Sequence, residues 1–215
     1  EKARELGFPL KIHVDEFEAL GGTRLAVELG AASADHLVKT TDEELQMLAE
    51  SHTVAVSLPC TPFGLADPHY TQARAIIDNG GVLALASDLN PGTAWCGNMQ
   101  FVMALACRYL RLTPAEALTA ATINAAAAIK REDTIGSIEP GKAADLVAFD
   151  LSGLAQQPVY DPVSQLIYAT GRDCAKHLWV GGKHLLDDGK LTRMDEQQLC
   201  ATAKAWGQRI SGQPH

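Results

Sequence analysis

Two histidines and an aspartate stand out because each lies in or directly after an apolar run of the chain. His13 lies in the first such run, His36 follows a short second one, and Asp88 follows residues 82–87. Neutral imidazoles and carboxylates are ligands that zinc and iron take in proteins. An aspartate at the end of an apolar strand is also costly to bury unless it is paired or bound to a metal. We therefore predict that these three residues share one metal-dependent hydrolytic site.

Other polar residues near His13 have simpler interpretations when each is taken alone. Glu16 comes one turn after His13 and is then a solvated loop acid, while Asp15 is a turn residue. The remaining histidines fall at helix ends, loops or hairpin positions, and we interpret them as structural or solvated. His69 is the one reserve candidate for the site among them. They are His52, His69, His177, His184 and His215.

The loop after Asp88 is a candidate for substrate binding. It carries Asn90, Gly92 and Thr93, and a glycine there would let the backbone approach a ligand closely. The amides and the hydroxyl of this loop could bind a carboxylate or a ring amide. A plain turn that opens after Asp88 is the alternative on these residues alone.

The elements that would position these residues alternate between strand and helix. Apolar segments near residues 10–14, 34–37, 53–58 and 82–87 predict strands. Helical patterns lie near residues 21–29, 41–49, 70–78, 99–111 and 113–129, and residues 59–68 predict a loop. This alternation indicates an α/β fold with parallel strands, either half of an eight-fold barrel or a small open sheet. In a barrel, the strand ends converge on one mouth.

The pattern changes after residue 134. Residues 136–150 predict a turn and a short strand, and residues 175–180 and 183–186 flank Gly181-Gly182 as in a β-hairpin. Residues 196–210 predict a closing helix. We therefore expect a small β element over 135–190 and a C-terminal helix within 191–215, beside an α/β part over 1–134.

Composition excludes several classes of protein. The chain has 215 residues, 47% of them hydrophobic, and a net charge of −8, which is typical of a globular protein without a nucleic-acid or anionic-membrane partner. No apolar run approaches the roughly 20 residues that span a bilayer, and no signal peptide is visible. The five cysteines are widely spaced and form no CxxC pair, which favours a reducing cytoplasm and buried thiols.

Several motifs resemble a known family. KIHVDEF at 11–17, SADHL at 33–37, SLPCTPFGL at 57–65 and SDLNPGTAW at 87–95 resemble the second half of the imidazolonepropionase family, within the metal-dependent amidohydrolase superfamily. Residues 113–129 and 135–150 are similar to the superfamily's last barrel helix and its return into a β-sandwich. The resemblance implies the second half of a (β/α)₈ TIM-type barrel, with strands five to eight in 1–134 and a β-sandwich segment in 135–190.

The resemblance also implies roles for the candidate residues. His13 and Asp88 would be metal ligands on strands five and eight, and Asp88 would accept a proton from the attacking water. His36 would polarise or hold the substrate carbonyl, and Glu16 would be an acid/base partner near the scissile amide. The substrate would be held by Asn90, Gly92 and Thr93.

The implied cofactor is one Zn²⁺ or Fe ion, and the implied substrate is a small molecule. The reaction would be hydrolysis of 4-imidazolone-5-propanoate to N-formimino-L-glutamate in histidine degradation. Either metal would activate water and polarise a ring carbonyl.

Two features depart from that family. No His-x-His pair occurs in the sequence, and two metal ligands where about four are expected predict weak metal binding by this chain alone. Residues 158–206 look more like the chlorohydrolase and S-adenosylhomocysteine deaminase branch, so a heterocycle deaminase is the alternative enzyme. A third possibility is an inactive half-barrel that associates with itself as a homo-oligomer or with a missing N-terminal half, because open sheet edges invite association.

Overall fold

The structure is a computed structural model that describes residues 2–212. Its contacts group the chain into two compact units, each described here by itself. The first contains residues 1–142 and 158–170, and the second contains residues 143–157 and 171–215.

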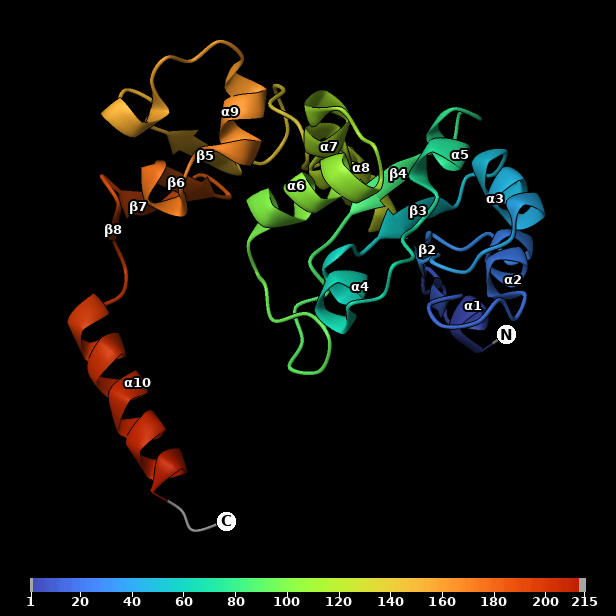
Figure 1. Ribbon diagram of the computed structural model, residues 1–215, viewed down its shortest axis with the longest axis horizontal. Helices are drawn as coiled ribbons and strands as arrows, with labels where there is room; N and C mark the ends of the chain where they lie inside the picture. Colours follow the sequence, from blue (N-terminus) through green and yellow to red (C-terminus); the bar gives the residue numbers. More distant parts are fainter. Residues whose placement is uncertain (1, 213–215) are drawn as a thin grey trace. The chain divides into compact units, whose positions relative to one another are not determined.

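The first unit is built on a parallel sheet in chain order, β1-β2-β3-β4. Its strands are β1 (Lys11–Val14), β2 (Ser33–His36), β3 (Val54–Ser57) and β4 (Leu83–Leu85). The helices of this unit are α1 (Lys2–Glu5), α2 (Gly22–Glu28), α3 (Asp42–Ala49), α4 (Cys60–Leu65), α5 (Ala73–Ile77), α6 (Met99–Tyr109), α7 (Pro114–Ala121), α8 (Ile123–Ala128) and α9 (Pro162–Tyr168). Figure 1 shows α2 and α3 along one side of the sheet and α7 and α8 beside β4. The predicted α/β class with a parallel sheet is confirmed.

Both faces of β3 are buried, since all four of its residues are buried, as is common for a strand in a parallel sheet. Ala55 packs into a large core with the covering helices, and this core also takes up Leu83 and Leu85 of β4. Val54 and Val56 point the other way, because side chains alternate along a strand, and pack in a second cluster with Ala128 of α8. The sheet therefore has a helix face and a second face that α8 covers in part.

The predicted loop over residues 59–68 is wrong, because α4 forms there. Pro59 is its N-cap residue and Pro62 lies in the first turn, where backbone N–H groups have no partner within the helix. The prolines therefore remove no hydrogen bond that the helix needs. Ala66 ends the helix in a left-handed conformation, with φ 55°.

The predicted helix over residues 113–129 is in fact two helices. Thr113 caps α7 in a reciprocal capping box with Glu116, as the sequence Thr-Pro-Ala-Glu indicates. The chain leaves helical geometry at Thr122, where φ is −122° and ψ is −93°. The hydroxyl of Thr122 donates to the carbonyl of Leu118 at 2.7 Å, a local bond of the kind that competes with regular helix.

The second unit is an antiparallel sheet followed by a helix. Its strands, in the order β5-β6-β7-β8, are β5 (Leu146–Phe149), β6 (Ala175–Val180), β7 (Lys183–Asp187) and β8 (Lys190–Leu191). Two short 3₁₀ turns, η1 (Leu154–Gln156) and η2 (Arg172–Cys174), lie between β5 and β6 in sequence. The predicted hairpin is confirmed, and its turn residues Gly181 and Gly182 have φ of 55° and 74°. Such positive φ angles suit glycine best.

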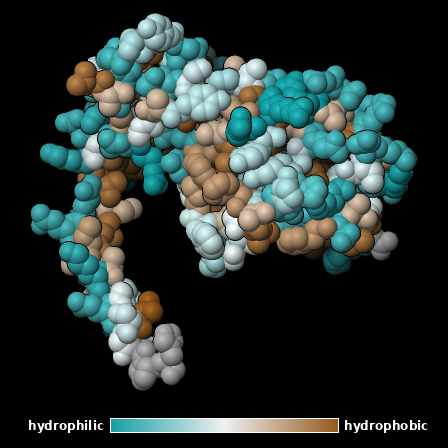
Figure 2. All heavy atoms as spheres, in the orientation of Figure 1, coloured by the Kyte–Doolittle hydropathy of each residue, from teal (hydrophilic) through white to brown (hydrophobic). Residues whose placement is uncertain are grey.

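The last described helix is α10 (Glu196–Ser211). Figure 2 shows hydrophobic residues along one side of α10 and hydrophilic residues along the other. Leu199, Trp206 and Ile210 are all exposed on it. The end of the predicted segment, residues 213–215 with His215, lies outside the described residues. Among the helices that the structure describes, none is long and apolar enough to cross a membrane.

One segment belongs to a different unit from the one that the sequence suggested. Residues 158–170, with α9, belong to the first unit rather than with the β element. The side-chain amide of Gln100 on α6 donates to the carbonyls of Leu166 and Thr170, each at 2.8 Å, and Ile167 is buried in the main core. The division at residues 134 and 190 stays a prediction.

Candidate active site

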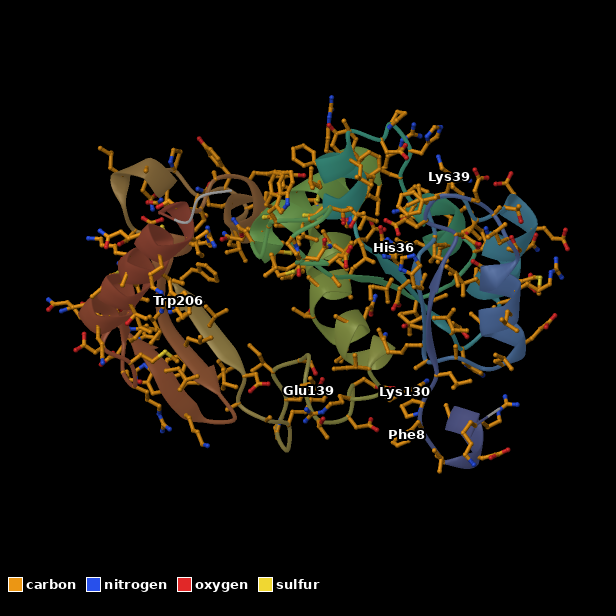
Figure 3. The ribbon with its side chains drawn as sticks, turned by 90° about the horizontal axis from the view of Figure 1, so that it is seen from below. Phe8, His36, Lys39, Lys130, Glu139 and Trp206 are labelled. Carbon is orange, nitrogen blue, oxygen red and sulfur yellow. The ribbon has the colours of Figure 1, made fainter. Side chains whose placement is uncertain are left out.

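The candidate residues lie at one edge of the parallel sheet. His13 lies in β1, His36 is the last residue of β2, and Asp88 comes three residues after β4. Because the strands are parallel, their C-terminal ends meet at the same edge. Figure 3 shows Phe8, which precedes β1, at one end of the sheet and His36 and Lys39 toward the other.

A cavity of about 420 Å³ opens beside these strand ends, on the face that α8 covers. His13, His36 and Asp88 all line it, together with apolar side chains of β3, β4 and α8. The structure thus brings the three predicted residues to one cavity. A mostly apolar cavity with a few converging polar groups is the usual form of a small-molecule site.

Three side chains form the centre of the site. Nε2 of His13 lies 3.0 Å from Oε2 of Glu16, and Nδ1 of His36 lies 3.8 Å from Oε1 of the same carboxylate. The two imidazole rings are 4.3 Å apart between centroids. The Glu16 side chain is only 10% exposed, so the simpler interpretation of it as a solvated loop acid is wrong.

His36 is held as a buried imidazole. It is 5% exposed, and its Nδ1 is buried without a hydrogen-bond partner among the described residues. Burial lowers the pKa of His36, and the neighbouring Glu16 carboxylate offsets part of that effect. The lowered pKa favours the neutral imidazole, which is the form that can bind a metal or accept a proton.

The backbone turns sharply at the ends of the strands that carry the site residues. Asp15, His36 and Asp88 have φ of 52°, 84° and 50°, in the left-handed region that residues other than glycine seldom adopt. Such conformations cost on the order of 1 kcal/mol each and persist where the surroundings hold them, often at functional sites. This conformation changes the direction of the side chains at the end of each strand.

Asp15 holds the end of β1 in this conformation. Its carboxylate accepts hydrogen bonds from the hydroxyl of Thr23 at 2.6 Å and from that of Thr40 at 3.1 Å. Asp15 is 6% exposed, and both threonines are buried. Its role is structural, which agrees with its interpretation as a turn residue.

Asp88 is positioned by a residue that the sequence analysis missed. The hydroxyl of Thr61, on α4, donates to Oδ2 of Asp88 at 2.7 Å. Next to it, a Cβ atom added at Gly64 would lie 2.0 Å from the carbonyl oxygen of Thr93. Only glycine therefore lets α4 approach the loop that follows β4. Because the sequence predicts a loop over residues 59–68, no sequence signal places Thr61 beside the site.

The thiol next to Thr61 is poorly suited to act as a nucleophile. Burial raises the pKa of the Cys60 thiol to about 11, and Cys96 adds to the shift. A thiol with this pKa stays protonated near neutral pH, and the thiolate is the nucleophile. The expectation of buried thiols holds for Cys60 and Cys174, but it is wrong for Cys200, which is exposed.

The side chain of Asn90 orders the loop that follows Asp88. Oδ1 of Asn90 accepts from the backbone N–H groups of Gly92 and Thr93, each at 2.8 Å. Its amide nitrogen donates to the carbonyl of Asp88 at 2.7 Å. None of the three loop residues is among the described residues that line the cavity. Their predicted role in binding substrate stays a prediction.

Further polar residues line the cavity along the strands, and the sequence analysis missed them. Nζ of Lys11 lies 3.7 Å from Oδ1 of Asp35 and donates to the carbonyl of Ala128 at 3.2 Å. The hydroxyl of Ser33 donates to Asp35 at 2.6 Å. Lys11 precedes His13 by two residues, so the period of the strand places both on one face. That alternation is the signal that could have identified Lys11.

The donor set fits a transition metal ion. One atom each from His13, Glu16 and His36 lies within 4.8 Å of the other two, and the two histidines line one cavity with Asp88. Two imidazoles and carboxylate oxygens are the ligands that zinc and iron prefer. The unpartnered Nδ1 of His36 is also the kind of buried atom that a ligand would satisfy. Glu16 and His36, expected to act on the substrate, therefore lie close enough to His13 to be ligands as well.

Comparisons with known proteins agree with this chemistry. The chain is 59% identical over 150 residues to an imidazolonepropionase of Herpetosiphon aurantiacus, covering 70% of this chain and 35% of that relative. It is 41% identical over 190 residues to an imidazolonepropionase of Streptococcus gordonii, covering 88% and 43%. The chain thus spans less than half the length of these two curated relatives.

Two solved structures show the same fold. An adenosine deaminase from Xanthomonas campestris with bound zinc has a TM-score of 0.84 and 31% identity, covering 98% of this chain and 52% of that one. An atrazine chlorohydrolase from Arthrobacter aurescens, complexed with zinc, has a TM-score of 0.81 at 21% identity, covering 95% and 49%. The amidohydrolase fold of these neighbours is of the TIM-barrel type. A model of the amidohydrolase family matches residues 2–185, and the chain belongs to that family.

Proposed function

We propose that this chain forms the active-site half of a metal-dependent amidohydrolase that hydrolyses 4-imidazolone-5-propanoate to N-formimino-L-glutamate. The observation that carries the proposal is the convergence of His13, Glu16 and His36 within 4.8 Å, next to a cavity that the two histidines line together with Asp88. The substrate is supported by the similarity to imidazolonepropionases at 59% and 41% identity.

His13 and Asp88, which line one cavity, would hold one metal ion, Zn²⁺ or Fe, and donor atoms of Glu16 and His36 lie within 4.8 Å of a donor atom of His13. The ion would supply Lewis-acid polarisation of the ring carbonyl and activation of water near neutral pH. Zinc is bound in the two structural neighbours described above.

The protein side chains would then move the protons. Asp88, held by Thr61, accepts a proton as the water oxygen bonds to the carbonyl carbon. His36 holds the carbonyl oxygen, and its neutral form suits a hydrogen bond rather than an ion pair. Glu16, as the acid/base partner near the scissile amide, would relay to the ring nitrogen the proton that Asp88 has taken, as the C–N bond breaks. Asn90, Gly92 and Thr93 form the ordered loop that we assign to substrate binding.

The fold of the whole protein follows the same proposal. The strands β1 to β4 would be strands five to eight of an eight-stranded barrel, and β5 to β8 would be one sheet of a β-sandwich. Among the described residues, β1 and β4 each have one edge without a partner strand. Such edges favour pairing with a second chain or with an N-terminal half. We place the protein in the cytoplasm, as a homo-oligomer or a completed barrel.

The proposal is tested by assaying the chain with Zn²⁺ or Fe²⁺ on 4-imidazolone-5-propanoate, with product detected by mass spectrometry. We expect N-formimino-L-glutamate to form, and Asp88→Asn to slow its formation by about 10²- to 10⁴-fold. Asp133→Asn replaces an exposed aspartate outside the cavity and is the matched control. A folded, zinc-loaded chain that turns over no substrate would overturn the proposal in favour of a half-barrel that only associates.

A heterocycle deaminase is the second candidate. It is favoured by the zinc-bound adenosine deaminase structure, which covers 98% of this chain at 31% identity. An adenosine-type substrate in the same assay decides between them. Release of ammonia from that substrate, without turnover of the imidazolone, would replace the first proposal by the second.

A further inference from the structure

A second cluster of potential metal ligands lies in the second unit, on the hairpin of β6 and β7. One atom each from His177, His184 and Asp187 lies within 4.8 Å of the other two. Nδ1 of His177 is 3.1 Å from Oδ1 of Asp187, and Nε2 of His184 is 3.8 Å from the same oxygen. None of these residues lines the cavity of the first unit.

A β-bulge brings the three side chains to one face of the hairpin. Trp179 pairs with His184, but Leu178 pairs with Leu186, so Leu185 is an extra residue in β7. In a regular strand, His184 and Asp187 would point to opposite faces, because they are three residues apart. The extra residue restores them to the same face. The bulge therefore creates the cluster.

One potential metal-ligand atom of the cluster has no hydrogen-bond partner among the described residues, and a tryptophan ring stacks on the histidine that carries it. Nε2 of His184 is buried and has no hydrogen-bond partner in the part of the chain that the structure describes. The ring of Trp179 stacks on that of His184, with centroids 4.6 Å apart and 8° between the planes. This stacking fixes the imidazole, which lowers the entropy that a bound ion would have to remove. The Asp187 carboxylate is 61% exposed and leaves the site open to solvent.

We propose that His177, His184 and Asp187 bind a divalent transition-metal cation of the Zn²⁺ or Cu²⁺ class. Two imidazole nitrogens and a carboxylate oxygen match the ligand preferences of these ions, and water can complete the coordination. The ion joins β6 to β7 next to the bulge. Because it binds the folded hairpin, it stabilises the hairpin by mass action.

Zinc titration of the full chain tests the site, monitored by calorimetry in a His13→Gln background that removes one donor of the first cluster. We expect one Zn²⁺ to bind per chain. Asp187→Asn and His184→Gln should each weaken binding by about tenfold or more, since loss of even an outer-sphere partner costs 10–100-fold. His52→Gln removes an exposed histidine outside both clusters and should leave the affinity unchanged.

Tryptophan fluorescence gives an independent measurement in the same background. Cu²⁺ bound to His184 lies next to the Trp179 ring and should quench its emission. The quenching should disappear in Trp179→Phe and in Asp187→Asn, and Asp187→Asn is the conservative variant that keeps the stack. Zinc binding that is equal in Asp187→Asn, His184→Gln and their background would overturn the site, as would a folded background chain that binds no zinc.

Discussion

The two ligand clusters of this chain contain the same types of side chain, and they are assembled in opposite ways. His13, Glu16 and His36 converge because two parallel strands end at one edge, and their two histidines are separated by a crossover through α2. His177, His184 and Asp187 lie within one hairpin, and a single bulge aligns them. The first cluster is partly buried, with His36 only 5% exposed, and the second is open.

The first cluster therefore depends on the whole fold of its unit, whereas the second depends on one local irregularity of a hairpin. The first cluster requires the sheet, the left-handed strand ends and the contacts of Asp15. The second requires only that two adjacent strands pair with one extra residue. Substitutions that affect one cluster should therefore leave metal binding at the other intact.

The largest effect should come from Asp88. Asp88→Asn keeps the shape of the side chain but removes the proton acceptor, and we expect kcat to fall by about 10²- to 10⁴-fold, the range for general acid–base catalysis. Steady-state kinetics on 4-imidazolone-5-propanoate measure this loss. Zinc binding at the hairpin should persist in the same variant, and a parallel loss there would contradict the independence of the two clusters.

Asp15 should have the largest effect on stability. Asp15→Ala removes the acceptor of the Thr23 hydroxyl, the Thr23 N–H and the Thr40 hydroxyl, and the two hydroxyls can then bond only to each other. We expect a loss of about 3 kcal/mol in the free energy of unfolding. Urea denaturation measures it. Asp187→Asn is the contrasting variant, and because its side chain is 61% exposed it should change stability by less than about 0.5 kcal/mol. Similar losses of unfolding free energy in both variants would show that the two clusters do not differ in their contribution to the stability of the fold.

Insertion of one alanine between Leu178 and Trp179 tests the bulge directly, because it gives Leu185 a partner in β6 and makes the pairing regular. In a regular strand, His184 and Asp187 lie on opposite faces, and zinc affinity at the hairpin should fall by about tenfold or more. Calorimetry in the His13→Gln background measures the affinity, and circular dichroism reports whether the chain folds. Unchanged affinity in a folded insertion variant would show that the bulge does not align the ligands.

The smallest effect should come from the cap of α7, away from both clusters. Hydrogen bonds from Arg74 and from the Thr113 backbone lower the pKa of Glu116. A carboxyl with a lowered folded pKa stabilises the fold above its unfolded pKa, and this contribution is lost as the pH falls through the folded value. Because the side chain is 30% exposed, we expect Glu116→Gln to cost only about 0.5–1 kcal/mol near neutral pH.

Chemical denaturation of both proteins at neutral and acidic pH measures this difference. The gap between wild type and Glu116→Gln should narrow in acid. A gap that widens as the pH falls would contradict the sign of the shift.

Two members of the first cluster, His13 and His36, and the nearby Asp88 could be found from sequence because they depend on the regular part of the fold. Apolar runs identify strands, parallel strands place their ends together, and His13, His36 and Asp88 follow from those two facts. The roles of these residues as ligand, base or carbonyl partner stay predictions. Thr61 could not be found, because two prolines made α4 look like a loop.

The hairpin cluster escaped sequence analysis for a different reason. The alternation of a regular strand assigns His184 and Asp187 to opposite faces, and His184 was interpreted as structural or solvated. A bulge depends on pairing with the neighbouring strand, which local sequence does not specify. Glu16 was misjudged for a related reason, since its 10% exposure results from the tertiary packing of the strand ends.

The close approach of Gly64 to the carbonyl of Thr93 also bears on how this protein can change over time. A methyl group at position 64 would push α4 away from the loop, and Thr61 would carry that displacement to Asp88. In a saturation library selected for activity, position 64 should tolerate almost no replacement, although its residue has no side chain to touch a ligand. Lineages that drift toward new substrates should therefore keep glycine there while the cavity walls vary around it.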